Sequence, residues 1–254
     1  MPRFFINPSQ LGTDARGAQT VRIVGDDAHH ITKSLRMREG ETLTVCDKAC
    51  TEYTCRIRSL GEEVVADVLS SARSVTEPPY AATLYQALCK GDKFDNLVQK
   101  AVECGVTRIV PVLTDRCVVR LTAADAEKKR LRWQRIAGEA AKQCGRGIIP
   151  EVSGLLLFSQ AVAKAAEADL PLFCYENETV QTLPALTSSC PRPATVSLLI
   201  GSEGGFSPEE AAAAAAGGMR SVGLGRRILR TETASSFVLA CLSYAYEMGA
   251  AMEG

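Results

Sequence analysis

The sequence carries no excess charge of either sign. Its 29 Lys and Arg residues balance 29 Asp and Glu residues, so the formal net charge is zero. No overall positive field steers such a protein onto nucleic acid, and any such binding must come from local basic clusters. Charged residues at 23% and hydrophobic residues at 46% are ordinary globular values, which argues against a disordered or fibrous chain.

Long apolar runs are also missing. No uninterrupted stretch reaches the roughly 18 residues that a membrane span needs. The opening stretch, MPRFFINPSQLG, contains Arg3 and two prolines but no apolar core of a secretory signal. We therefore expect a cytoplasmic protein without a membrane span.

Histidine is scarce, and cysteine lacks the spacing of a metal site. The chain has two histidines, His29 and His30, and ten cysteines, none of which forms a Cys-x-x-Cys pair. The densest group, Cys46, Cys50 and Cys55, lies downstream of the histidines without zinc-ligand spacing. We expect no metal, and we expect mostly reduced cysteines that serve as packing residues.

A glycine-rich loop, SLLIGSEGGFSPEE (residues 197–210), lacks the lysine of a phosphate-binding loop. Its Gly-x-x-Gly-Gly spacing also differs from the G-x-G-x-x-G of dinucleotide folds. Ser207, Pro208 and Glu210 predict a capped helix start, so they need no catalytic role. Gly201, Gly204 and Gly205 are then typical either of a tight turn or of a backbone that approaches a ligand closely.

The first part of the chain predicts a small β-rich domain, because short β-forming runs alternate with turn residues. We expect a barrel or sandwich, interrupted by a helix over residues 26–37. Residues 70–79 are polar and end in two prolines. We place the domains at residues 1–72 and 81–254, with a linker at 73–80. The strands expected in the first domain are residues 22–24, 42–46, 54–57 and 64–68.

The second part alternates strands and helices, which predicts an α/β fold with a mostly parallel sheet. Residues 93–104 carry an apolar helical stripe, a long basic helix is expected over 123–144, and a nearly all-apolar helix over 237–248. Pro111 suggests an edge or a bend in the second strand. The expected strands are residues 83–89, 107–113, 171–175 and 195–200. Ligands in such sheets bind at the carboxyl ends of the strands, where the glycine-rich loop begins.

Two C-terminal motifs, LLIGSEGGFSPEE and LGRRILRTETA, resemble the paired motifs of the SPOUT class of RNA methyltransferases. The nearest resemblance is to the bacterial enzymes that methylate N3 of a uridine in 16S ribosomal RNA. It extends to RFFINP, to residues 90–119 and to WQRIAGEAAKQCGR, and thus covers nearly the whole chain. In this sequence Ser202 replaces a usual proline, and residues 47–53 (DKACTEY) replace a turn that is usually richer in glycine.

The resemblance implies a fold, a cofactor and a target. It implies a PUA-like N-terminal domain, a SPOUT domain with a deep trefoil knot, and a homodimer that binds S-adenosylmethionine in the knot. The implied target is N3 of the uridine conventionally numbered 1498 in the 16S rRNA of the small subunit. The implied cofactor-binding residues are Leu199, Ile200, Gly201, Glu203, Gly204, Gly205, Leu224, Gly225, Ile228, Leu229, Arg230 and Ala234.

Two residues are candidates for catalysis within these motifs. Arg230 is expected to stabilise negative charge on the uracil oxygens, with a helix cap or a dimer salt bridge as the alternative. Glu203 is expected to accept a proton or to face the cationic sulfonium, with hydrogen bonds to loop N–H groups as the alternative.

Basic residues of the first domain are candidates for RNA contact, with a solvated surface as the alternative. Trp133, in the basic helix, is expected to pack in the core rather than stack on a base. Two further functions stay open, namely methylation of another RNA nucleoside, and nucleotide or RNA binding without methyl transfer. The candidate RNA contacts are Arg3, His30, Lys33, Arg36, Arg38 and Arg146.

Overall fold

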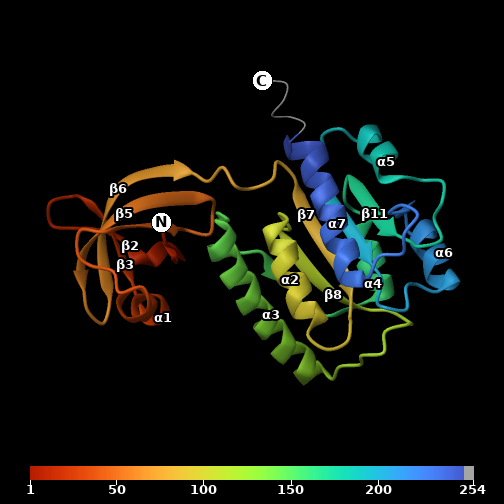
Figure 1. Cartoon of the computed structure of the whole chain (residues 1–254), viewed down its shortest axis with the longest axis horizontal. Coiled ribbons are helices and arrows are strands. Elements are labelled where there is room, and N and C mark those ends of the chain that lie inside the picture. The colour runs from red at the N-terminus through yellow and green to blue at the C-terminus, as the bar shows by residue number, and fades with distance from the viewer. Residues whose placement is uncertain (249–254) are drawn as a thin grey trace. The chain divides into compact units, whose positions relative to one another are not determined.

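A computed structural model describes residues 1–248 of the chain. The chain divides into two compact units. The first comprises residues 1–77 and 141–149, and the second comprises residues 78–140 and those from 150 onward (Figure 1). The segment 141–149, which the sequence analysis placed in the second domain, packs with the first unit, where the Thr76 hydroxyl donates to the Gly145 carbonyl at 2.9 Å.

The first unit is built on a six-stranded sheet of order β1-β4-β5-β6-β3-β2. Only the β1–β4 pairing is parallel. The predicted strands are present, some with longer bounds, and the pairings leave β1 and β2 at the two ends of the sheet. The strands are β1 (Arg3–Phe5), β2 (Leu11–Thr13), β3 (Gln19–Ile23), β4 (Thr42–Cys46), β5 (Thr51–Leu60) and β6 (Val64–Arg73).

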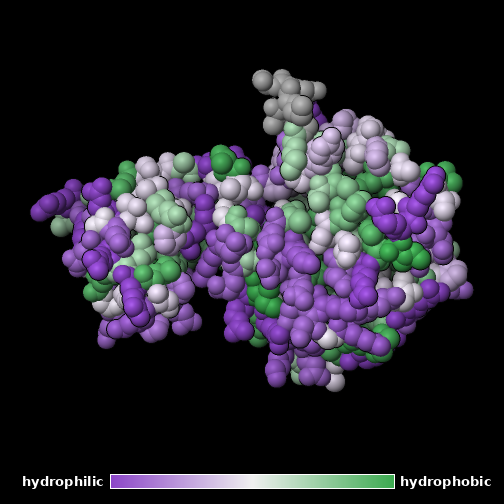
Figure 2. Space-filling view, viewed as in Figure 1, coloured by the Kyte–Doolittle hydropathy of each residue, from purple (hydrophilic) through white to green (hydrophobic). Residues whose placement is uncertain are grey.

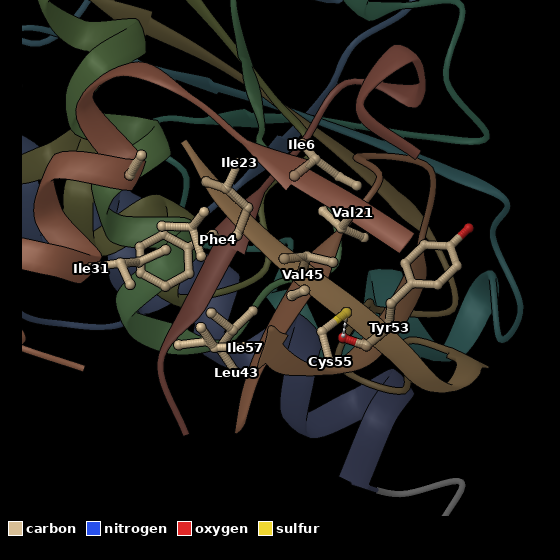
Figure 3. Packing of buried hydrophobic residues seen from close by; sticks show 13 residues of the cluster. Phe4, Ile6, Val21, Ile23, Ile31, Leu43, Val45, Tyr53, Cys55 and Ile57 are labelled. Atoms are coloured by element: carbon tan, nitrogen blue, oxygen red, sulfur yellow. Dashed lines mark hydrogen bonds between the residues drawn. The ribbon is translucent and has the colours of Figure 1, made fainter. Parts of the chain in front are cut away.

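One apolar cluster forms the core of this unit. Its side chains come from different strands and point toward one another, as Figure 3 shows for Phe4, Val21, Val45 and Ile57. The predicted helix is present as α1 (Gly25–His29), which continues as the π-helical segment η2 (His30–Ser34). Ile31 of η2 is fully buried in the same cluster, so this helical segment covers the core.

The turn between β4 and β5 holds non-glycine residues in a glycine-like conformation. Lys48 and Cys50 have φ angles of 65° and 67°. The Asp47 carboxylate accepts hydrogen bonds from the backbone N–H groups of Ala49 and Thr51 and closes the turn. The turn that the sequence analysis singled out as poor in glycine therefore uses left-handed backbone that glycine would adopt at lower cost.

The second unit contains a fully parallel sheet of order β10-β8-β7-β12-β11-β13, with β9 also paired to β8. Pro111, at which the sequence suggested an edge or a bend, does not lie on an edge strand, because β8 has neighbours on both sides. On one side β9 pairs with residues 108–109 and β10 with residues 112–113, so Pro111 falls between the two short strands. The strands are β7 (Ala81–Ala87), β8 (Arg108–Leu113), β9 (Glu151–Val152), β10 (Leu156–Leu157), β11 (Leu170–Cys174), β12 (Thr195–Ile200) and β13 (Arg220–Val222).

Helices cover this sheet. In α2 (Lys93–Glu103) all five residues of the predicted stripe are buried, from Phe94 to Val102. The predicted basic helix is present as α3 (Ala123–Cys144), and Figure 2 shows hydrophilic side chains over most of it. Trp133 of α3 is buried and stacks on Phe94 with a centroid distance of 4.0 Å, which confirms its packing role. The remaining helices are α4 (Phe158–Ala165), α5 (Leu183–Ser189), α6 (Pro208–Ala216) and α7 (Thr231–Ser243), and α7 continues as η3 (Tyr244–Met248).

The last helix begins six residues before the predicted start, at Thr231 rather than at residue 237. Its first turn carries polar residues, which the apolar pattern does not include. The helix packs against α2 on the sheet (Figure 1). No helix within residues 1–248 is long and apolar enough to cross a membrane.

Candidate active site

A cleft of about 520 Å³ lies at the carboxyl ends of β11 and β12. Three segments line it: the end of β11 with residues 175–176, the glycine-rich loop at 200–205, and the stretch from 224 into α7. Lys93 of α2 completes the wall. The volume lies in the range of small-molecule sites, roughly 300–1,000 Å³, and the place is the edge where parallel sheets bind ligands.

The cleft brings together every expected cofactor residue except one. Leu199 is fully buried and belongs to the apolar cluster of the second unit that also contains Phe173 and Phe206. Several lining residues did not stand out in the sequence. Tyr175 and Glu176 directly follow a parallel strand, and that position is the signal that could have found them. The lining residues that the sequence analysis did not assign are Lys93, Cys174, Tyr175, Glu176, Ser202, Arg226, Arg227, Thr231 and Glu232.

The glycine-rich loop makes its turn at Gly205, which has a φ angle of +65°. A Cβ atom at this position would overlap the Glu176 carboxylate. Gly205 donates its N–H to the Ser202 carbonyl at 3.0 Å, and Ser202 is buried. The positive φ angle favours glycine at position 205, and any larger residue would also displace the Glu176 carboxylate.

Glu203 is anchored by its own backbone N–H, by the loop between β7 and α2, and by Lys93 at the start of α2. Its carboxylate accepts a hydrogen bond from Lys93 Nζ at 2.8 Å and from the Lys90 N–H at 3.1 Å. Partial burial opposes ionisation, but the Lys93 hydrogen bond and the backbone hydrogen bonds outweigh it and lower the pKa of Glu203. The carboxylate is thus held as an anion beside an ammonium group.

Arg230 precedes α7 and leaves its guanidinium exposed at the cleft. Its backbone carbonyl accepts hydrogen bonds from Thr233 and Ala234, which begins the helix. Its side chain makes none of the ion pairs found within residues 1–248. Arg230 therefore caps the helix through its backbone carbonyl only, and its guanidinium is available to a ligand.

A buried polar network ties the two cleft loops to the sheet. Gln86, near the carboxyl end of β7, is fully buried and donates to Thr231 Oγ1 at 2.8 Å. The Thr231 hydroxyl donates to the Gly201 carbonyl at 2.6 Å, and Gln86 Nε2 reaches the same carbonyl at 3.3 Å. The end of β12 and the start of α7 are thereby fixed to each other.

The predicted helix start after the glycine-rich loop is confirmed. Ser207 accepts a hydrogen bond from the Glu210 N–H, and the Glu210 carboxylate accepts one from the Ser207 N–H, which is a capping box. Glu210 also accepts from the Asp115 N–H at 2.9 Å. These groups brace the loop and do not line the cleft.

The candidate RNA contacts fall into two groups. His30, Lys33, Arg36 and Arg38 are exposed on or just after the α1 and η2 segment. Arg3 and Arg146 are instead occupied within the protein. Both are also largely withdrawn from solvent, which differs from the surface role expected of them.

The carboxylate partners of these two arginines are well defined. Arg3 makes a two-pronged ion pair with Glu52, with distances of 2.9 and 3.1 Å. Arg146 is 3% exposed and pairs with Glu77, with an Nη2 to Oε2 distance of 2.6 Å.

Comparison with known proteins places the chain in a family. An RNA methyltransferase domain model matches residues 76–243, and an RNA methyltransferase PUA domain model matches residues 23–66. These matches and the parallel sheet with its cleft define an RNA methyltransferase. A relative from Bacillus subtilis, named ribosomal RNA small subunit methyltransferase E, is 32% identical, and the alignment covers 98% of each chain. The chain belongs to this family of RNA methyltransferases.

Solved structures agree over nearly the whole length. A ribosomal RNA small subunit methyltransferase E from Neisseria gonorrhoeae, bound to S-adenosylmethionine, is 30% identical with a TM-score of 0.82, covering 97% of this chain and 98% of that one. A methyltransferase from Legionella pneumophila in complex with the same cofactor is 31% identical with a TM-score of 0.84, covering 96% and 98%.

Proposed function

We propose that the protein transfers a methyl group from S-adenosylmethionine to N3 of the uridine numbered 1498 in 16S rRNA of the small ribosomal subunit. The family is one of ribosomal RNA methyltransferases, and two similar structures hold this cofactor. The observation that carries the proposal is the cleft itself, which gathers both C-terminal motifs at one edge of the sheet.

The residues of the cleft suit S-adenosylmethionine. The glycine-rich loop of the cleft offers main-chain N–H and C=O groups at close range, and the apolar residues Ile200, Leu224 and Leu229 flank these groups. S-adenosylmethionine carries no phosphate, which accounts for the missing lysine in the loop. When bound, it supplies a methyl group already activated on a cationic sulfonium. We place Glu203, held as an anion, on the sulfonium side of the cleft.

Arg230 is the residue we assign to the substrate. Methylation at N3 leaves negative charge on the two uracil oxygens as the N3 proton departs. A guanidinium without an internal ion pair can donate to those oxygens and stabilise that charge. Because the methyl donor is already activated, positioning of the base supplies much of the acceleration.

The exposed basic residues of the first unit are proposed to hold the RNA. His30, Lys33, Arg36 and Arg38 make no ion pair within residues 1–248 and can reach phosphate oxygens. Phosphate contacts position RNA without reading its sequence, so binding should weaken as salt rises. A cytoplasmic location, where ribosomal subunits are found, stays a prediction.

We further propose a homodimer and a trefoil knot. A stripe on the last helix recurs every three or four residues and suits a helix partner. It consists of the exposed residues Phe237, Tyr244 and Met248 and the half-buried Cys241. For the knot, the support is the course of the chain after β13. Directly after β13, the Gly223 N–H donates to the Gln181 carbonyl. The chain then crosses back over the sheet, where α7 packs against α2.

The test combines cofactor binding with product analysis. The protein is titrated calorimetrically with S-adenosylmethionine, and small ribosomal subunits that lack the modification are incubated with both. Binding together with N3-methyluridine in digested rRNA is the expected result. Another methylated nucleoside would keep the enzyme class and overturn the target, whereas absence of cofactor binding would overturn the proposed activity.

A further inference from the structure

The proposed reaction needs a group that removes the N3 proton. The neutral uracil N3 becomes a nucleophile only when its N–H bond breaks, so a proton acceptor near the cleft accelerates the transfer. No histidine is among the residues that line the cleft. The candidates are therefore its carboxylates, Glu176, Glu203 and Glu232, the thiol of Cys174 in its wall and the thiol of the adjacent Cys89.

The basic and thiol groups cannot accept this proton. Arginine stays protonated in proteins, which excludes Arg226, Arg227 and Arg230. The hydrogen bond to Glu203 raises the pKa of Lys93, so its ammonium has no lone pair to offer. Burial raises the pKa of the Cys89 thiol and that of the Cys174 thiol to about 12 each and keeps both neutral.

Two of the three carboxylates are poor acceptors. Glu203 already accepts from Lys93 and from the Lys90 N–H, and the pKa of Glu203 is lowered by these hydrogen bonds despite partial burial. A carboxylate made less basic in this way has less drive to take a proton. Glu176 is exposed, where water solvates its charge.

Glu232 differs from both. It lines the cleft from the first turn of α7, and its Oε2 atom is buried without a hydrogen-bond partner within residues 1–248. A buried oxygen without a partner is costly, because it has lost its water without gaining a donor. Such an atom is satisfied when a ligand donates a hydrogen bond to it.

The neighbouring contacts fix where Glu232 lies. Thr231, the preceding residue, is locked to Gln86 and Gly201 by the buried network. The Glu232 carbonyl accepts from the Ser235 and Ser236 hydroxyls. These hydrogen bonds hold the backbone at the start of α7 in place, as a group that must meet a substrate proton requires.

We propose that Glu232 is the proton acceptor for methylation at N3. This proposal rests on the proposed function and names a catalytic residue for it. The N3–H bond breaks and its proton passes to the Glu232 carboxylate. The electron pair left on N3 forms the bond to the methyl carbon, while the S–C bond breaks and its electrons neutralise the sulfonium to a thioether. Glu232 then returns the proton to water.

The surrounding charges are compatible with this step. Lys93 of α2 and the neutral Cys89 thiol lie within electrostatic range of Glu232, and both also lie within that range of Glu203. Arg230, directly before α7, stabilises the uracil oxygens as the proton leaves. Since Lys93 is already paired with Glu203, Glu232 is left to the substrate.

The experiment compares Glu232→Gln with Glu209→Gln. Glu209 is the second residue of α6 as Glu232 is of α7, but it is exposed and does not line the cleft. The control therefore removes the same charge from the same position of a helix. Single-turnover rates are measured on small subunits at saturating S-adenosylmethionine from pH 6 to 9, and cofactor affinity is measured by calorimetry.

For Glu232→Gln we expect a rate lowered by about 10²- to 10⁴-fold, with the cofactor Kd within about twofold of wild type. Its remaining rate should rise about tenfold per pH unit, because only uracil that has already ionised reacts. Glu209→Gln should match wild type in rate and pH profile. If Glu232→Gln does not fold, Glu232→Ala is assayed with added formate, which should restore activity as an external acceptor.

Three results would overturn the proposal. A normal rate in Glu232→Gln would exclude Glu232 as the acceptor. A higher Kd for S-adenosylmethionine, with a normal rate at saturating cofactor, would make Glu232 a cofactor-binding residue. Failure of formate to rescue a folded Glu232→Ala would leave the carboxylate without a role in proton transfer. Absence of N3-methyluridine from wild type and Glu209→Gln alike would instead overturn the proposed function.

Discussion

At the scale of single residues, the arginines of this protein divide by what their guanidinium groups contact. Arg146 is buried against Glu77, which also accepts the backbone N–H groups of Gly147 and Ile148. Arg38 is exposed and makes no ion pair within residues 1–248. The first kind holds the fold, and the second is available to an anionic partner.

This division predicts different effects of removing each side chain. Arg146→Ala leaves the Glu77 carboxylate partly buried and unpaired, and should lower the free energy of unfolding by about 3–5 kcal/mol. Arg38→Ala should change stability by less than about 0.5 kcal/mol and weaken RNA binding. Urea denaturation and RNA binding at two salt concentrations measure these effects. An Arg146→Ala protein as stable as wild type would refute the structural role.

The pair of Arg3 and Glu52 predicts a dependence of stability on pH. The hydrogen bond from Arg3 holds the pKa of Glu52 below its ordinary value, although desolvation opposes it. A carboxyl whose pKa is lowered on folding stabilises the protein above its unfolded pKa, near 4.3, and loses that contribution as pH falls through the folded value.

Glu52→Gln should therefore destabilise the protein at pH 7, and the difference from wild type should shrink toward pH 3. Glu62→Gln, at an exposed carboxylate in the turn between β5 and β6, is the control and should show no such change. Urea denaturation at several pH values measures both. A destabilisation of Glu52→Gln that is independent of pH would contradict the assignment.

At the scale of elements, local patterns predicted much of the fold. Apolar spacing predicted the buried stripe of α2, and Ser207 with Glu210 predicted the start of α6. The bounds expected for the basic helix match those of α3. The start of α7 was missed because the stretch RTETA (residues 230–234) is polar. Its Thr231 is held by a hydrogen bond from Gln86, which is 145 residues away along the chain. The Arg146–Glu77 pair was missed for the same reason, since pairing across the chain leaves no local pattern.

The same reasoning explains which parts of the site were predictable. Both cleft motifs stood out because glycine at a strand end marks a close backbone approach. Lys93 and Glu232 did not stand out, because an ordinary charged residue on a helix predicts only a solvated face. Only the structure shows that one braces Glu203 and that the other has a buried oxygen without a donor.

The network between β7, β12 and α7 predicts a coupling between stability and cofactor binding. Thr231→Val keeps the side-chain shape but removes the hydroxyl, which leaves Gln86 Nε2 and the Gly201 carbonyl short of a partner. We expect a loss of about 1–3 kcal/mol in the free energy of unfolding and a higher Kd for S-adenosylmethionine. Denaturation and calorimetry test this. Thr233→Val, at an exposed position of the same helix, is the control and should leave both values unchanged.

At the scale of the whole molecule, each unit has a core of its own, and an apolar stripe on the last helix stays exposed to solvent. The residues Phe237, Tyr244 and Met248 are 38%, 72% and 60% exposed. They lie on the last helix, over which Figure 2 shows pale green and white atoms rather than strongly hydrophilic ones. The opposite face of this helix packs against α2 and the sheet. The exposed apolar stripe is therefore free to bind a partner outside the chain.

A second copy of the chain is the partner we propose, and Tyr244→Glu tests it. Because Tyr244 is largely exposed, a charge there should leave the fold intact and prevent association by desolvation of the new carboxylate. Light scattering on a size-exclusion column should give about twice 27.2 kDa for wild type and 27.2 kDa for the variant. Val75→Glu, at a residue 94% exposed outside the stripe, should remain dimeric. A monomeric wild type would refute the dimer, and a Tyr244→Glu protein that stays dimeric would place its interface elsewhere.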